Sequence, residues 1–391
     1  MAARKRASAS DTTKSDTDKP KPETHQTESP LRPAKLFTIF KFFLVFSIPY
    51  FFLIFSYYKM EYELRKSILI NSIVSFIGFF ATVSMIPVAS KYVLRRNLFG
   101  YDINKKGTPD GSIKVPESLG IVVGIVFLVV TILFQYFNFT ADSNWLVEYN
   151  AALASICFMI LLGFVDDVLD IPWRVKLILP SIAALPLLMA YAGHTTIIIP
   201  KPLVPYVGLK ILDLGWIYKL YMWLLAVFCT NSINIHAGIN GLEVGQTVII
   251  ACAILIHNVM QIGASTDPKY KQAHAFSIYL IQPLLATSLA LLSYNWYPSS
   301  VFVGDTYTYF AGMTMAVAGI LGHFRDAWNI QGSDSKSIYE RFLFILKLSG
   351  KGCNFSCLWF FGLYSDSQSA LTLIFGLLLI KLRFQVSINY H

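Results

Sequence analysis

The sequence predicts an all-α protein, a polytopic transmembrane helical bundle with about ten spans. Of its 391 residues, 55% are hydrophobic and only 14% are charged, too few to cover a soluble domain of this size. Several apolar runs reach the roughly 20 residues that a helix needs to cross the hydrocarbon core of a bilayer. Helices are expected because backbone polar groups inside lipid must be satisfied within the segment itself.

The chain divides into four parts. Residues 1–35 are polar and rich in Lys, Ser, Thr, Asp and Pro, which predicts a disordered cytoplasmic tail. Residues 36–66 supply an extra N-terminal span and a short lumenal link, 67–323 form a transmembrane core, and 324–391 are a divergent region with one or two less certain spans. The clearer spans are expected at 36–58, 68–94, 119–139, 147–165, 177–192, 216–234, 244–263, 275–293 and 306–322.

The distribution of charge assigns the two sides of the membrane. If the basic tail is cytoplasmic, alternation places four connections on its side: 95–118, 166–176, 235–243 and 294–305. The first of these carries five Lys and Arg residues, as the excess of positive charge in cytoplasmic loops predicts. The net charge of +9 therefore favours a membrane protein that binds anionic ligands over a nucleic-acid-binding protein.

Three aspartates end one apolar run. Asp166 and Asp170 are four positions apart and would share a helix face, with Asp167 turned about 100° away. Adjacent carboxylates repel one another unless a cation or a shared proton relieves them. A solvated cluster at the membrane edge is one interpretation. The cations that follow, Arg174 and Lys176, favour a site for phosphate and metal.

Polar residues also interrupt two later apolar runs. Asn231 and Asn234 are three apart at the end of one run, where they could bind a ligand or simply cap a helix. His236 is a weaker candidate acid or base. Asp305 directly precedes another run, so it is a candidate metal ligand or an ordinary helix N-cap. The polar loop from Gly100 could recognise a nucleobase or serve as a solvated connector.

Six runs of residues carry a resemblance to a known family. They are Lys105 with Pro116-Glu117-Ser118, Leu162-Gly163-Phe164 with Asp166-Asp167, Trp173-Arg174 with Lys176-Leu177, Ala226 to Asn231, Asn234 with Gly238 to Glu243, and Asn295 to Pro298 with Val301 to Thr306. With these runs, residues from about Ser67 to His323 resemble the polyprenyl-phosphate N-acetylhexosamine-1-phosphate transferases, and their eukaryotic branch most of all.

The resemblance implies a site, residue by residue. The implied Mg²⁺ ligands are Asn234 and Asp305, and the implied catalytic residues are Asp166, Asp167 and Lys176. The two aspartates could act as nucleophile, base or organiser of charge. The implied site for dolichyl phosphate consists of Lys176 and of Val227, Phe228, Cys229, Thr230, Asn231, Ser232, Ile233, Asn234 and Ile235. The implied contacts with UDP-GlcNAc are Tyr101, Asp102, Ile103, Glu117 and Asn240.

The resemblance also implies an activity: Mg²⁺-dependent transfer of GlcNAc-1-phosphate from UDP-GlcNAc to dolichyl phosphate, in the endoplasmic reticulum membrane with the site facing the cytosol. Membrane lipid is a further expected partner. The sequence does not fix the oligomeric state, and a homodimer is one alternative. One departure is that the basic Arg-His-Arg type motif of the family does not follow His323. Two rivals therefore stay open: an inactive diverged relative, and a transporter with its acids inside the spans.

Overall fold

The computed structural model describes residue 33 and residues 36–102, 105, 107, 111, 113–140, 143–198, 208, 211–235 and 238–322. The predictions for the N-terminal tail, for Ile103, for His236 and for the region from His323 onward lie outside these residues. The described helices are α1 (Leu36–Phe52), a π-helix (Leu53–Tyr57), α2 (Tyr62–Arg95), α3 (Gly120–Asn138), α4 (Asn144–Leu169), α5 (Trp173–Ala183), α6 (Leu185–Ala190), α8 (Trp216–Ile235), α9 (Leu242–Ala264), α10 (Pro268–Asn295) and α11 (Gly304–Gly322). The strands form two short antiparallel pairs, β1 (Phe99–Gly100) with β2 (Val115–Pro116) and β3 (Thr196–Ile198) with β4 (Ile211–Asp213).

The prediction of an all-α, polytopic membrane protein is confirmed. Within the described residues, seven helical stretches are long and apolar enough to cross a membrane. They are Leu36–Tyr57, Tyr62–Arg95, Gly120–Asn138, Trp145–Leu169, Trp173–Ala190, Leu242–Ala264 and Pro268–Asn295. Many apolar side chains of α1, α2 and α3 are exposed on the outside of the bundle, as contact with lipid requires.

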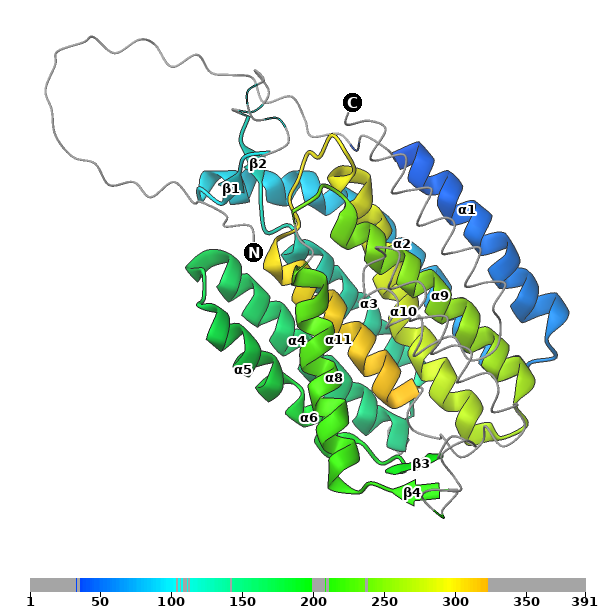
Figure 1. Cartoon of the computed structure of the whole chain (residues 1–391). Coiled ribbons are helices and arrows are strands. Elements are labelled where there is room, and N and C mark those ends of the chain that lie inside the picture. Colours follow the sequence, from blue (N-terminus) through cyan, green and yellow to red (C-terminus); the bar gives the residue numbers. More distant parts are fainter. Residues whose placement is uncertain are drawn as a thin grey trace, which may run out of the picture.

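Helix α11 lies in the middle of the bundle, packed against α3, α4, α8 and α10 (Figure 1). Nearly all of its side chains are buried. Glycines on the neighbouring helices permit this close packing. A Cβ on Gly163 of α4 would lie 2.5 Å from Thr306 Cα, and one on Gly120 of α3 would lie 2.5 Å from Tyr307 N. Small residues at such contacts let helix backbones approach closely, and here they set the position of the first turn of α11.

Two details differ from the expected spans. The run expected at 177–192 is divided into α5 and α6 at Ala184, close to Pro180 and Pro186. Pro186 lacks the backbone donor that a continuous helix would bond to Ile182 O. The span expected from residue 275 begins earlier, because Pro268 opens α10 and Asp267 accepts a hydrogen bond from Lys269 N as its N-cap.

The polar connections gather at one end of the bundle. The β1–β2 hairpin, the α4–α5 connection, the end of α8 and the start of α11 lie at this end, and the β3–β4 hairpin lies at the other (Figure 1). Direct contacts join the first group: Phe302 N donates to Pro116 O at 2.8 Å, and Gly120 N donates to Val303 O at 3.0 Å. The loop before α11 is thereby attached to the hairpin.

Candidate active site

Asp166 lies near the end of α4 and makes contacts with three other groups. Its Oδ2 atom is 2.8 Å from Lys176 Nζ and accepts a hydrogen bond from Tyr309 Oη at 3.0 Å. Its Oδ1 atom accepts from Ile171 N at 3.0 Å. The side chain is only 1% exposed. A carboxylate so deeply buried needs such partners, because an unpaired charge at this depth is costly.

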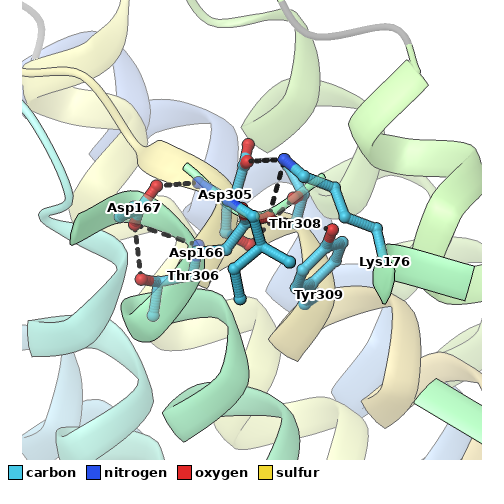
Figure 2. A network of polar contacts seen from close by, with 8 residues as sticks. Asp166, Asp167, Lys176, Asp305, Thr306, Thr308 and Tyr309 are labelled. Atoms are coloured by element: carbon cyan, nitrogen blue, oxygen red, sulfur yellow. Dashed lines mark hydrogen bonds and ion pairs between the residues drawn. The ribbon is translucent and has the colours of Figure 1, made fainter. Parts of the chain in front are cut away.

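Asp167 points to a different neighbour, the start of α11 (Figure 2). Its Oδ1 atom accepts from Asp305 N at 2.6 Å, and its Oδ2 atom accepts from Thr306 N at 3.1 Å and from Thr306 Oγ1. The first backbone N–H groups of a helix have no partner within the helix. Asp167 therefore caps α11 from another helix and adds a negative charge at the positive end of its dipole.

Gly304 makes this cap possible. It has a φ of +73°, a conformation that glycine adopts without strain. A Cβ added at Gly304 would also collide with the Asp167 carboxylate, since it would lie 2.8 Å from Oδ1. The alternative that Asp305 is an ordinary N-cap is wrong: Asp305 lies inside the first turn of α11, and the capping carboxylate is that of Asp167.

Lys176, on α5, connects α4 to α11. Its Nζ atom is 2.8 Å from Asp166 Oδ2 and 3.1 Å from Asp305 Oδ2, so one ammonium group lies between two carboxylates (Figure 2). The side chains of Lys176 and Asp305 are 23% and 15% exposed. A small hollow adjoins this ion pair, with about 200 Å³ of empty space that includes open solvent, and apolar side chains of α4 and α5 form much of its wall.

Asn234 reaches the same cluster through Tyr309. Its side chain lies close to the Tyr309 hydroxyl group, which donates to Asp166. Asn234 is half-buried in the last turn of α8. The two residues predicted as metal ligands, Asn234 and Asp305, thus border one cluster at one end of the bundle. In the described part of the chain, no group of three or more His, Cys, Asp or Glu side chains is arranged to hold a metal by itself.

Those residues predicted to contact the nucleotide sugar that the structure describes lie at the same end of the bundle as this cluster. Asn240 Nδ2 donates to Asp102 Oδ2 at 3.0 Å, which joins the β1–β2 hairpin to the turn before α9. Asp102 is buried, Glu117 is half-buried and Tyr101 is exposed. The turn is held from its other side as well, because Gly241 N donates to Asn295 Oδ1 at 3.0 Å.

The predicted dolichyl-phosphate stretch on α8 divides by exposure. Cys229, Thr230, Ser232 and Ile233 are buried, whereas Phe228 and Ile235 are exposed and Val227, Asn231 and Asn234 are half-buried. The buried face packs on α11, where Gly312 lies against the backbone of Cys229 and Thr230. Asn231 Nδ2 donates to Val227 O at 2.9 Å within the helix. The outer face alone is open to a ligand.

Helical spacing predicted that Asp170 would share the helix face of Asp166, and this prediction is wrong. Helix α4 ends at Leu169, and Asp170 follows in the left-handed conformation with a φ of +52° and an exposed side chain. Sequence reasoning also missed Tyr309 and Thr306 as members of the cluster. The available signal for Tyr309 was its spacing, since it lies four positions after Asp305 and so on the same face of α11.

The fold and the cluster define a class: a multi-pass helical membrane protein with a carboxylate–lysine site at one end. Comparison with known proteins is more specific. The model of glycosyl transferase family 4 matches residues 149–323. A UDP-N-acetylglucosamine–dolichyl-phosphate N-acetylglucosaminephosphotransferase of Dictyostelium discoideum is 53% identical over 272 residues, covering 63% of this chain and 66% of the relative. A protein of the same name from Leishmania amazonensis is 33% identical over 344 residues, covering 65% of this chain and 73% of the relative.

The chain belongs to glycosyl transferase family 4. It spans 61–66% of the length of the first three curated relatives, which come from Dictyostelium discoideum, Schizosaccharomyces pombe and Saccharomyces cerevisiae. The matched family residues contain the whole of the carboxylate–lysine cluster, from Asp166 to Tyr309.

Proposed function

We propose that this protein transfers GlcNAc-1-phosphate from UDP-GlcNAc to dolichyl phosphate, giving GlcNAc-diphosphodolichol and UMP. The observation that carries the proposal is the cluster of Asp166, Lys176 and Asp305, which lies at the same end of the bundle as the β1–β2 hairpin. The names of the relatives from Dictyostelium and Leishmania supply the two substrates. The reaction is the first step in assembling the lipid-linked oligosaccharide for N-glycosylation.

The reaction is a direct displacement at phosphorus. An oxygen of dolichyl phosphate attacks the phosphorus that carries GlcNAc, a new P–O bond forms, and the bond from that phosphorus to the bridging oxygen breaks. UMP leaves with the electron pair. The acceptor phosphate is largely ionised near neutral pH, since the second pKa of a phosphate monoester is about 6. It therefore needs no strong general base, and the task of the protein is to bring two anions together.

Lys176 is the residue proposed to receive the acceptor. Its ammonium group lies beside a small hollow whose wall also includes Leu162, Ile171 and Leu179. A charged group beside apolar side chains matches a lipid phosphate, whose head needs a cation and whose chain needs an apolar surface. The exposed Phe228 and Ile235 of α8 would extend that surface.

Mg²⁺ fits this donor set. The ammonium group of Lys176 already places one positive charge between Asp166 and Asp305, so the arrangement of oxygens accepts a cation. Asp166, Asp167 and Asp305 carry three formal negative charges against one positive, which leaves room for a divalent ion. Mg²⁺ commonly takes one or two protein oxygens together with water and phosphates, and Asp305 and Asn234 would provide them. When bound, it would neutralise charge on the diphosphate and on the leaving UMP.

The remaining residues position these groups. Asp167 holds the first turn of α11 and thereby sets where the Asp305 carboxylate lies. Asp166 orients Lys176 and is itself fixed by Tyr309. With Asp167 engaged at a helix terminus and Asp166 against a lysine, both aspartates suit positioning better than nucleophilic attack. Trapping a phosphorylated aspartate with UDP-GlcNAc alone would contradict this assignment.

The end of the bundle that carries the site is proposed to face the cytosol, in the endoplasmic reticulum membrane. The basic residues of the loop 95–118 support this orientation. The transporter alternative is disfavoured, because its acids should lie along the spans and face a cavity. Asp166, Asp167 and Asp305 lie instead at helix ends, on the same end of the bundle as the β1–β2 hairpin.

The test is conversion of radiolabelled UDP-GlcNAc into a lipid-extractable product by the purified chain with Mg²⁺ and dolichyl phosphate, together with exchange of labelled UMP into UDP-GlcNAc. We expect Asp305→Asn to lower both rates by about 100-fold or more, because a charge contact at the reacting phosphates is lost. The matched control is Asp213→Asn, an exposed aspartate on β4 at the opposite end, which should retain the wild-type rates. A folded wild-type chain without either activity would instead identify an inactive relative.

A further inference from the structure

A second polar cluster lies between membrane-spanning helices and joins α1 to the bundle. Gln282 Nε2, on α10, donates to Tyr50 Oη of α1 at 2.9 Å and to Ser72 Oγ of α2 at 2.8 Å. Asn71 Nδ2, also on α2, donates to Gln282 Oε1 at 2.6 Å. Side chains that hydrogen-bond across helices hold them together where lipid offers no alternative partner. None of these residues belongs to the carboxylate–lysine cluster.

A crevice opens directly over this network, between α1, α2, α9 and α10. It contains about 580 Å³ of empty space, and none of its lining side chains is charged. Its walls are mainly aromatic: Phe40, Phe43, Phe46, Phe51, Phe76 and Phe79. Helix α1 lies at the edge of the bundle (Figure 1), and it exposes large apolar side chains such as Val45 and Ile48. An occupant of this crevice would therefore enter from the membrane and would be uncharged.

Two buried polar atoms of α2, one of them in a residue that lines the crevice, have no hydrogen-bond partner among the described residues. They are Asn71 Oδ1 and Ser75 Oγ, in side chains that are 0% and 4% exposed. Because they are four positions apart on α2, they lie on the same face of the helix, and Ser75 lines the crevice. An unsatisfied buried polar atom is costly. A hydroxyl group satisfies both, since it can accept from Ser75 and donate to Asn71.

The depth of this pair restricts the ligand further. Ser75 lies thirteen residues after Tyr62, the first residue of α2, which is about 20 Å along a helix about 50 Å long. This depth is within the hydrocarbon region of a bilayer that the helix crosses. A charged head group is expensive there, which disfavours phospholipids. A small neutral polar group on a hydrocarbon chain is the chemistry that fits.

We propose that this crevice is a binding site for a long-chain lipid alcohol. The hydroxyl group donates to Asn71 Oδ1 and accepts from Ser75 Oγ, and the chain lies along the phenylalanine side chains. The site is separate from the carboxylate–lysine cluster and depends on α1, which lies outside the family match at residues 149–323. The proposal is independent of the transferase activity, so either can fail without the other.

The test compares two ligands that differ in one hydrogen-bond donor. The purified, delipidated full chain is titrated with oleyl alcohol or with oleyl methyl ether, and bound lipid is counted by native mass spectrometry. We expect the alcohol to bind about fivefold more tightly than the ether, the effect of one hydrogen bond. Ser75→Ala should weaken binding of the alcohol about fivefold. The matched control is Ser84→Ala, an exposed serine of α2 whose hydroxyl group bonds to Ala81 O, and it should bind like the wild type.

Three outcomes would overturn the proposal. Equal binding of the alcohol and its ether would mean that the pair holds only an ordered water molecule. An unchanged affinity for the alcohol in Ser75→Ala would remove Ser75 from the site. In a third titration with cholesterol, tighter binding of the sterol than of oleyl alcohol would replace the long-chain ligand by a sterol. Folding is not in question for Ser75→Ala, because removing an unsatisfied hydroxyl group should leave the unfolding temperature of the delipidated protein unchanged or raise it.

Discussion

The contact between Asp167 and α11 makes a prediction that separates a structural role from a chemical one. In Asp167→Asn, the side chain keeps its shape but retains only one acceptor oxygen. If that oxygen stays with Thr306, the amide group faces Asp305 N, and a donor at the helix terminus loses its partner. This loss costs about 1–3 kcal/mol, and loss of the charge at the helix N-terminus costs about 0.3–2 kcal/mol. We therefore expect the free energy of unfolding to fall by about 1–5 kcal/mol.

The assay is the thermal unfolding of purified variants in one detergent, measured beside their rates in the proposed transfer reaction. The matched control is Asp170→Asn. Asp170 is exposed and has a left-handed backbone conformation, which asparagine tolerates. The unfolding free energy of this variant should therefore differ from the wild-type value by no more than about 0.5 kcal/mol. Activity of Asp167→Asn should fall together with stability as the first turn of α11 loosens. A variant with wild-type stability and no activity would refute the capping role and make Asp167 a group that acts in the reaction itself.

Two further substitutions test the same region. Gly304→Ala should lower the unfolding temperature by as much as Asp167→Asn. The new Cβ would collide with the Asp167 carboxylate, and the φ of +73° would be strained for alanine. A wild-type unfolding temperature would contradict this. Tyr309→Phe removes one of the hydrogen bonds on Asp166, so we expect a loss of about 1 kcal/mol in unfolding free energy and a reduced rate, with Tyr297→Phe, an exposed tyrosine, as control. Full activity in Tyr309→Phe would show that Lys176 and Ile171 N suffice to hold Asp166.

The sequence predicted the fold class and the shared side of the polar connections, because both depend on long-range averages. Apolar length marks a membrane span, and loop charge marks a side. The hydrogen-bond partners of the individual site residues could not be predicted from the sequence. Nothing in the run Gly304-Asp305-Thr306 indicates that its capping carboxylate comes from α4, 138 positions away. Likewise, Asp170 left the predicted face because α4 ends one residue earlier, and helix ends depend on caps and packing more than on periodicity.

The adjacent aspartates have different partners because of the geometry of a single helix. Successive residues of an α-helix point about 100° apart, so two neighbouring carboxylates at the end of α4 cannot face the same group. Asp167 therefore meets the first turn of α11, and Asp166 meets Lys176 from α5. Both aspartates act on Asp305. Asp167 fixes its backbone, and Asp166 holds Lys176, which pairs with the Asp305 carboxylate. The aspartate pair thus locates a third carboxylate from two directions, which is the precision that the proposed site for metal and phosphate requires.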